Sequence, residues 1–350
     1  MAKITLSVGY ARIDITPPLG VHIAGYFKER IADTVLDPLE ACAIAVSDGK
    51  KKAVLITLDL CGLYGDEGGT AWRQAVAEAA GIDLADVYIH ATHTHQGPNT
   101  RISCENPLNK SYVAYLAHKV EDVALLAIAD LAPAKMGFGT REAKNVAFIR
   151  RYRMKDGTAK TNPGVNNPDI VAPIGTTDER VHVLRFDREG KDSIVLANFA
   201  NHPDVVGGTG ISGDWPSMTR RFTEKALDNV KCIFFNGAQG DVIHVDRRYP
   251  DPAKRGPTHS RYMGRVLAAA VLSAYDTAVP IASDTVFYRE SIARVAVAKG
   301  TDEQVRIAAD IHRDFLEKKD LSAYPFDIVM ARKYLRLEEC GPTVDLKVVS

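Results

Sequence analysis

Residues 86–98 read Asp-Val-Tyr-Ile-His-Ala-Thr-His-Thr-His-Gln-Gly-Pro, an apolar run that leads directly into a polar turn with two histidines. The run 86–91 is short and carries β-branched and aromatic residues, which is typical of a buried strand. Four further runs have the same character, at residues 52–60, 181–186, 193–199 and 231–235. We expect these five runs to form the central sheet.

Helical patterns alternate with these strands along the chain. They cover residues 67–80, 110–131, 215–226, 260–274 and 302–317. This alternation predicts an α/β fold with helices on the faces of the sheet and ligands bound at the carboxyl ends of the strands. Residues 139–177 lack a helical pattern and are rich in Gly, Asn, Pro and Arg. We interpret this segment as a packed loop that forms a lid or wall of the site.

The composition is ordinary for a globular protein. Of 350 residues, 46% are hydrophobic and 25% charged, and the formal net charge is zero, so nothing favours nucleic acid or an anionic membrane as a partner. No apolar run is long enough to span a bilayer, and residues 1–6 are too short and polar for a secretory signal. A cytoplasmic location is therefore expected.

Cysteine spacing gives no metal or disulfide motif. The five cysteines are Cys42, Cys61, Cys104, Cys232 and Cys340, and no two of them form a CxxC pair. We therefore expect neither a disulfide framework nor a cysteine-built zinc site. Cys61 could act as a nucleophile, but a buried structural thiol is the favoured interpretation.

Polar residues that follow the predicted strands are the candidates for chemistry. They are Asp59, His93, His95, His202, Asp214 and Asp241. Neutral imidazole is a good zinc ligand, and catalytic zinc usually takes three protein ligands and a water. His93 and His202 could supply two ligands, and one of the three aspartates the third. The alternative is that the histidines only form hydrogen bonds in a loop.

Other chemistries have less support. The chain has no GxSxG elbow, P-loop, GxGxxG or HExxH motif. The cluster Arg150-Arg151-Tyr152-Arg153 could clamp an anion or polarise a carbonyl group, or it could be a solvated basic turn.

Four segments resemble the neutral/alkaline (non-lysosomal) ceramidases and their short bacterial relatives. These are Gly-Tyr-Ala-Arg-Ile-Asp-Ile-Thr-Pro-Pro at 9–18 with Ala-Gly-Tyr at 24–26, Ala-Thr-His-Thr-His-Gln-Gly-Pro at 91–98, Asn-His-Pro at 201–203 with Ile-Ser-Gly-Asp at 211–214, and Ala-Gln-Gly-Asp-Val at 238–242. Their order and spacing agree with the family from residue 9 to about residue 282.

The resemblance implies an α/β catalytic domain around a mixed central sheet, with helices on both faces, and zinc-dependent amide hydrolysis with Zn2+ as the cofactor. By position, His93 and His202 are similar to the zinc-binding histidines, and His95 to the histidine that contacts the reacting centre. Either Arg150 or Arg151 matches the arginine that polarises the substrate. Asp241, within the last shared segment, is a further catalytic candidate. Asp59 and Asp214 remain candidate metal ligands.

The resemblance also implies what should complete the site. In the family, a Glu from a Pro-Gly-Glu-Pro turn and a Tyr bind the zinc, and this turn is absent here. We expect a catalytic domain at 1–282 and a strand–helix–strand continuation of it at 283–350, truncated at the C-terminus.

The expected substrate is a small-molecule or lipid-like amide or ester, as in lipid metabolism. A lactone or other small carbonyl ester is an alternative substrate. A non-catalytic metal-binding protein or an inactive relative is an alternative function, and homo-oligomerisation stays open.

Overall fold

The computed structural model describes residues 6–26, 28–63, 69–101, 107–249, 254–282, 285–286, 290–318 and 326–349. Cys104, residues 1–5 of the N-terminus, the start of the helix expected at 67 and the terminal Ser350 lie outside these ranges. The described cysteines Cys42, Cys61, Cys232 and Cys340 carry free thiols. No helix in the described ranges combines the length and the apolar character that crossing a membrane requires.

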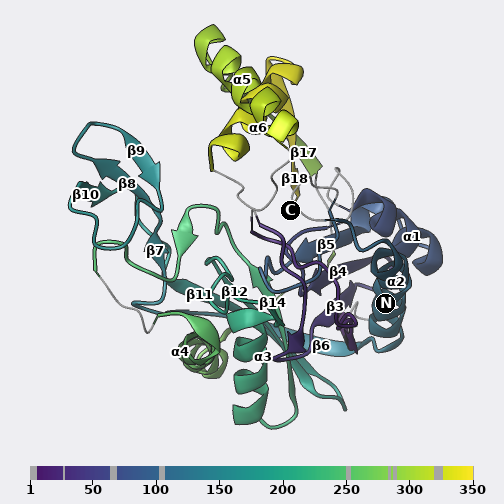
Figure 1. Cartoon of the computed structure of the whole chain (residues 1–350). Helices are drawn as coiled ribbons and strands as arrows, with labels where there is room; N and C mark the ends of the chain where they lie inside the picture. The colour runs from purple at the N-terminus through teal and green to yellow at the C-terminus, as the bar shows by residue number, and fades with distance from the viewer. Residues whose placement is uncertain are drawn as a thin grey trace.

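A mixed sheet forms the centre of the described molecule (Figure 1). Its strands lie in the order β14 (Val230–Asn236), β12 (Ser193–Phe199), β11 (Arg180–Arg188), β6 (Ala132–Glu142), β1 (Ser7–Asp14), β3 (Glu40–Ser47), β4 (Lys52–Leu58) and β5 (Val87–Ala91), with β16 (Val279–Ile281) paired to β6. The pairs β4–β5 and β12–β14 are parallel and the other neighbours are antiparallel.

The two halves of this sheet pack against each other. Side chains alternate between the faces of a strand, so each strand contributes to two different layers. In β3, for example, Cys42 and Ile44 face the inner cluster, together with Ile233 and Phe235 of β14. The alternate residues, among them Ala43, belong to an outer cluster. The inner cluster therefore joins the β1–β3–β4–β5 half to the β6–β11–β12–β14 half.

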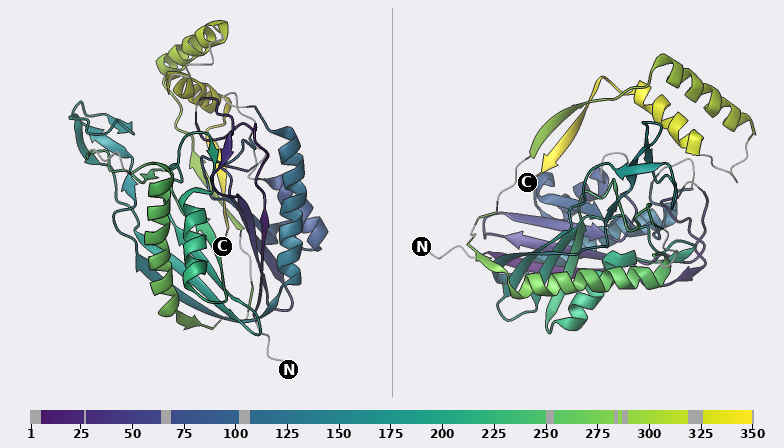
Figure 2. Two further views of the ribbon diagram at one scale, coloured as in Figure 1. Left: turned by 60° about the horizontal axis from the view of Figure 1, so that its bottom comes forward. Right: turned by 90° about the vertical axis from the view of Figure 1, so that its left-hand side faces the viewer.

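Helices cover the outer face of each half, which gives four layers (Figure 2). Helices α1 (Thr70–Ala80) and α2 (Lys110–Ala129) pack on the first half, and α3 (Asp214–Ala226) and α4 (Gly256–Asp276) on the second. Trp215 of α3 packs edge-on against Phe199 and Phe234. The predicted α/β class, with a mixed sheet and helices on both faces, is confirmed.

Residues 139–177, predicted to be a loop, contain several strands, so this prediction was wrong. Residues 139–142 complete β6, and the rest forms β7 (Phe148–Ile149), β8 (Arg151–Met154), β9 (Ala159–Thr161) and β10 (Ile170–Pro173). Strands β10, β8 and β9 form a small antiparallel sheet of their own. The turns between them use residues with positive φ, among them Asn162 and Gly157, which Asn and Gly tolerate best. Because Asn and Gly are abundant in this segment, its sequence does not show the apolar pattern from which strands are predicted.

Shorter pairs of strands join loops around the sheet. Strand β15 (Val242–Ile243) pairs with β7, and β13 (Gly210–Ile211) pairs with β2 (Thr34–Val35). Towards the C-terminus, β17 (Glu290–Ala296) pairs with β18 (Thr343–Val349). Between them, α5 (Asp302–Lys318) and α6 (Phe326–Glu339) pack on each other and stand away from the main sheet (Figures 1 and 2). This order is strand–helix–helix–strand, and the domain division at residue 282 stays a prediction.

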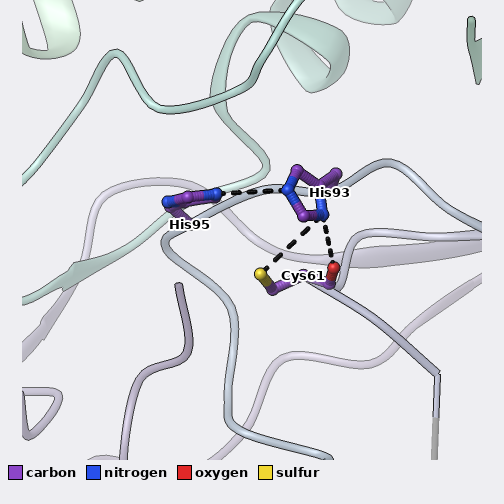
Figure 3. A group of neighbouring side chains, drawn as sticks. All are labelled: Cys61, His93 and His95. Carbon is purple, nitrogen blue, oxygen red and sulfur yellow. Dashed lines mark hydrogen bonds between the residues drawn. The ribbon is translucent and has the colours of Figure 1, made fainter. Parts of the chain in front are cut away.

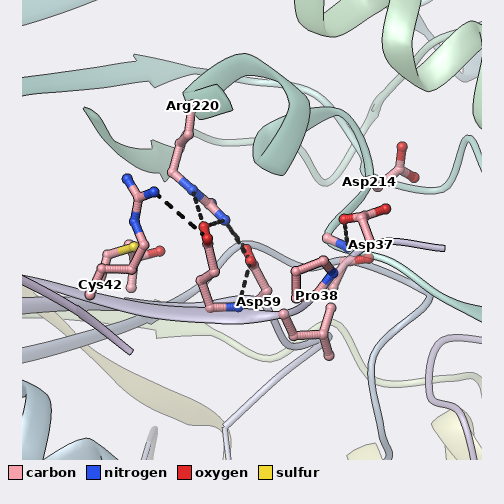
Figure 4. Close-up of polar contacts among 12 residues, drawn as sticks. Asp37, Pro38, Cys42, Asp59, Asp214 and Arg220 are labelled. Atoms are coloured by element: carbon pink, nitrogen blue, oxygen red, sulfur yellow. Dashed lines mark hydrogen bonds and ion pairs between the residues drawn. The ribbon is translucent and has the colours of Figure 1, made fainter. Parts of the chain in front are cut away.

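A buried ion pair ties α3 to the opposite half of the sheet (Figure 4). The Arg220 guanidinium, 1% exposed, binds both carboxylate oxygens of Asp59, at 3.1 and 2.6 Å, and reaches Glu40 of β3 at 2.9 Å. Asp59 directly follows β4 and is 0% exposed. Although burial opposes ionisation, the charges of Asp59 and Glu40 raise the pKa of Arg220. The guanidinium therefore stays charged.

Arg220→Met should lower the free energy of unfolding by about 3–5 kcal/mol, because it leaves the buried Asp59 carboxylate without its partner. Urea unfolding followed by circular dichroism measures this change. Arg313→Met is the matched control, because Arg313 is exposed and pairs on the surface with Asp310. Its removal should shift the value by less than about 1 kcal/mol. Equal effects of the two substitutions would contradict the role given to Arg220.

Candidate metal centre

His93 stands just beyond the end of β5, in the turn predicted to carry the site. Its backbone N–H donates to the Leu60 carbonyl at 2.9 Å, and that of Thr92 donates to Leu58. Its φ is 72°, in the left-handed region that non-glycine residues rarely adopt. Strain of this kind persists where the surrounding structure fixes the backbone, and it is concentrated at functional sites.

His202 lies in the loop after β12, on the other half of the sheet. The side chain of Asn236, the last residue of β14, joins this loop to the turn of His93. Its amide donates to the Thr92 carbonyl at 3.0 Å and to the Asn201 carbonyl at 2.9 Å. The carboxyl ends of the two parallel strand pairs therefore meet at one place, as the sequence predicts for the site.

Three imidazoles converge there. His93 Nε2 lies 3.1 Å from His202 Nε2 and 3.3 Å from His95 Nε2. The three ring centroids are 4.6, 5.0 and 5.1 Å apart. Two nitrogen ligands of one tetrahedral zinc ion, each at its usual bond length, lie about 3.3–3.4 Å apart. The spacing of these nitrogens therefore fits ligands that share a single ion.

The opposite side of each ring faces an acceptor oxygen. His93 Nδ1 donates to the Cys61 carbonyl at 2.6 Å, and His202 Nδ1 to the Gln239 carbonyl at 3.1 Å. These bonds place the proton on Nδ1 and leave the lone pair on Nε2, as is usual for metal-binding histidines. His95 Nδ1 lies 3.7 Å from the Asp204 carboxylate, beyond hydrogen-bond distance.

The environment keeps all three rings neutral. Burial lowers the pKa of His93, and lowers that of His202 to about 4, with a further contribution from His93. Burial places the pKa of His95 well below its usual value, and the repulsion between protonated rings of His95, His93 and His202 lowers it further. Metal binding requires unprotonated imidazole, so these side chains are ready to bind an ion without releasing protons.

Cys61 belongs to the same cluster, on the other side of His93. Within the described ranges, ligand atoms of Cys61, His93 and His95 lie within 4.8 Å of one another, close enough to hold a metal ion. However, Cys61 Sγ is 3.9 Å from His93 Nδ1, the nitrogen that faces away from His95 (Figure 3). Burial raises the pKa of the Cys61 thiol to about 12, whereas metals bind the thiolate. The Nε2 side is the better site.

The three candidate aspartates lie elsewhere. Asp59 is bound by Arg220, and the Asp214 carboxylate accepts the N–H groups of Val205 and Trp215 at 2.8 and 2.7 Å. Asp241 is exposed. In the described part of the chain, no Asp or Glu joins the group of clustered ligand atoms. The structure brings the predicted histidines together without a carboxylate ligand.

Arg150 and Arg151 occupy different surroundings. Arg150 is partly buried, and its guanidinium donates to the Gly240 carbonyl at 2.5 Å. Its charge contributes to the lowered pKa values of His93, His95 and His202. Arg151, on β8, is exposed. Of the two arginines that sequence reasoning left open, Arg150 acts electrostatically on the histidines.

Sequence reasoning missed a second group of residues around His95. The Tyr26 hydroxyl donates to Asp204 at 2.5 Å, and the Arg30 guanidinium lies 3.8 Å from the Tyr26 ring centroid. Arg30 also donates to the His95 carbonyl at 2.6 Å and to Gln96 Oε1 at 2.7 Å. Both residues could have been suggested by their position next to the shared motifs, because Tyr26 ends the Ala-Gly-Tyr turn and Asp204 follows His202-Pro203.

Together, fold and site define a four-layer α/β protein with a histidine-built candidate metal centre where two sheet halves meet. No family model and no curated protein matches the chain. The solved neutral ceramidase from Pseudomonas aeruginosa is similar, with a TM-score of 0.66 and 17% sequence identity over 85% of this chain and 48% of that chain. A structure described as ceramidase complexed with C2 gives a TM-score of 0.65 at 16% identity, covering 85% and 47%.

The chain thus spans about half the length of these ceramidases. At this level of identity the similarity establishes the fold, and the expected neutral ceramidase-like fold is confirmed.

Gly25→Ala should displace the His95 ring, because an added Cβ would lie 2.5 Å from His95 Cγ. Gly20→Ala is the matched control. Gly25 and Gly20 both have positive φ, +99° and +87°, but the Cβ at position 20 meets nothing within 4 Å. Both substitutions add roughly 1–3 kcal/mol of backbone strain. Only Gly25→Ala should also shift the imidazole signals of His95 in long-range proton–nitrogen NMR spectra. Unchanged His95 signals would refute this packing.

Proposed function

We propose that this chain is a zinc-dependent hydrolase that cleaves an amide (N-acyl) bond or a related ester bond. The observation that carries the proposal is the 3.1 Å distance between the Nε2 atoms of His93 and His202, which suits two ligands of one ion, with the His95 ring next to them. The ceramidase-like fold supports the same reaction class. The free thiols of the described cysteines support the cytoplasm as its location.

His93 and His202 would hold the zinc ion through Nε2, because the Nδ1 atom of each already donates to a carbonyl. A zinc ion at this place supplies Lewis acidity, which polarises a carbonyl group and makes water a nucleophile near neutral pH.

His95 is the residue that we assign to proton transfer. Its ring is buried and neutral, and Nε2 faces the other two histidines. A neutral imidazole can accept a proton from water and return it to the leaving group. Asp204, at 3.7 Å from Nδ1, would stabilise the cation that forms in between. Asp204 is itself held by the Tyr26 hydroxyl.

Arg150 would stabilise the negative charge that develops on the carbonyl oxygen during attack. Two backbone groups fix it, since its guanidinium donates to Gly240 and its own N–H donates to the Asp241 carbonyl at 2.9 Å. Asp241 therefore contributes through its main chain. The substrate class is a small-molecule or lipid-like amide or ester.

His93→Ala and His202→Ala should each lose bound zinc while the fold is retained. His95→Ala should keep zinc and lose about 10²- to 10⁴-fold in turnover, the usual contribution of general acid–base catalysis. His118→Ala is the control, because His118 is exposed on α2. Mass spectrometric metal analysis of tag-free protein gives occupancy, and circular dichroism reports the fold.

Unchanged zinc content in both His93→Ala and His202→Ala would contradict the assignment of the metal site. Zinc binding without hydrolysis of any N-acyl amide or ester in a substrate screen would leave a metal-binding protein that is not an enzyme.

A further inference from the structure

The segment that follows β14 holds both His202 and Arg150. Three consecutive carbonyls take part, since Gln239 accepts from His202 Nδ1, Gly240 from the Arg150 guanidinium, and Asp241 from the Arg150 N–H. Pairing of β15 with β7 extends this contact. Arg150 therefore stands directly beside the histidine cluster.

Farther along the same segment, Arg247 connects to Arg150 through one residue. Asn162 donates its N–H to the Arg150 carbonyl at 2.7 Å and accepts from the Arg247 guanidinium at 3.2 Å. The Arg247 N–H donates to the Tyr152 hydroxyl at 3.0 Å. These contacts fix Arg247 close to Arg150.

Buried polar atoms in this region lack hydrogen-bond partners. Arg247 is 8% exposed and His244 is 3% exposed. Nε of Arg150 and Nε of Arg247 are buried without a hydrogen-bond partner, whereas the His244 ring interacts with the Lys254 backbone. Each unmatched buried donor destabilises the protein, and buried polar groups are normally paired. Two unpaired donors on arginines that share Asn162 as a contact indicate a group that the protein is built to receive.

The charges identify the kind of group. Burial lowers the pKa of Arg247, and the charges of Arg255 and Arg150 lower it further. Burial lowers the pKa of His244 to about 3, helped by His259, Arg255 and Arg247. Asp204, whose charge acts on both Arg247 and Arg150, is already the acceptor for Tyr26, and Asp241, which also acts on Arg150, is exposed. An anion would satisfy the open donors and relieve the repulsion among the arginines.

We propose that Arg247, with Arg150 beside the histidine cluster, forms a subsite for an anionic group of the substrate. The inference rests on the proposed hydrolase function and narrows its substrate class to N-acyl compounds whose head group carries a carboxylate or a phosphate close to the scissile bond. Arginine suits both oxyanions, because its donors form two parallel hydrogen bonds with either.

Three compounds with the same acyl chain test the subsite. They are N-dodecanoylglycine, N-dodecanoylethanolamine phosphate and neutral N-dodecanoylethanolamine. Calorimetry on the chelator-treated full chain measures binding without turnover, and kcat/KM on the zinc-loaded chain measures hydrolysis. At least one anionic compound should bind roughly 10- to 100-fold more tightly than the neutral one. The two anionic compounds distinguish a carboxylate from a phosphate site.

Arg247→Gln should remove most of this preference by weakening binding of the anionic compounds, and Arg247→Lys should restore part of it. Arg153→Gln is the matched control, because it removes one positive charge from an exposed position on β8. Circular dichroism and thermal unfolding confirm that the variants fold.

Equal binding of all three compounds, no binding of any, or a preference that survives Arg247→Gln would overturn the subsite. Tight binding of an anionic compound without its hydrolysis would support the subsite and count against the proposed function. Hydrolysis of the neutral compound alone would support the proposed function and count against the subsite.

Discussion

The ion pair between Arg220 and Asp59 is the interaction on which the rest of the structure depends. Asp59 precedes Leu60 and Cys61, whose carbonyls hold the backbone and the ring of His93. Arg220 belongs to α3, whose first residue, Asp214, accepts the N–H of Val205 in the loop after His202. One buried contact therefore orients both segments that position the histidines. Buried charges tolerate little displacement, because separation leaves each of them unpaired in a low dielectric.

The chemistry of the centre comes from how each ring is held rather than from the number of histidines. Carbonyl acceptors direct the lone pairs of His93 and His202 toward each other, and burial keeps the rings neutral. Near them the protein places the positive charge of Arg150 and the carboxylate of Asp204. In the proposed reaction, this arrangement would separate the functions of binding an ion, moving a proton and stabilising negative charge.

Much of the fold could be predicted from local pattern, and the failures have physical causes. The long apolar runs and helical periods placed β4, β5, β11, β12 and β14 and helices α1 to α5, but not β1 or β3. Strand β6 was missed because Gly137 and Gly139 interrupt its pattern, although an added Cβ at Gly139 would lie 2.1 Å from the Ala274 carbonyl of α4. Asp59 and Asp214 were candidate metal ligands because of their positions, Asp59 directly after β4 and Asp214 at the start of α3. Only their three-dimensional surroundings show that Arg220 and backbone N–H groups already occupy them.

By itself the sequence determined the α/β class, the turn that bears His93 and His95, and the loop that bears His202, because strand patterns and short polar motifs are local properties of a chain. Tertiary structure alone decided that the sheet folds over itself, that Asn236 joins the two histidine loops, and that Asp204 and Tyr26 support His95. It also decided which charged side chains are paired and which donors stay open around Arg247. These features depend on contacts between residues tens to more than a hundred positions apart, and no spacing within the sequence encodes them.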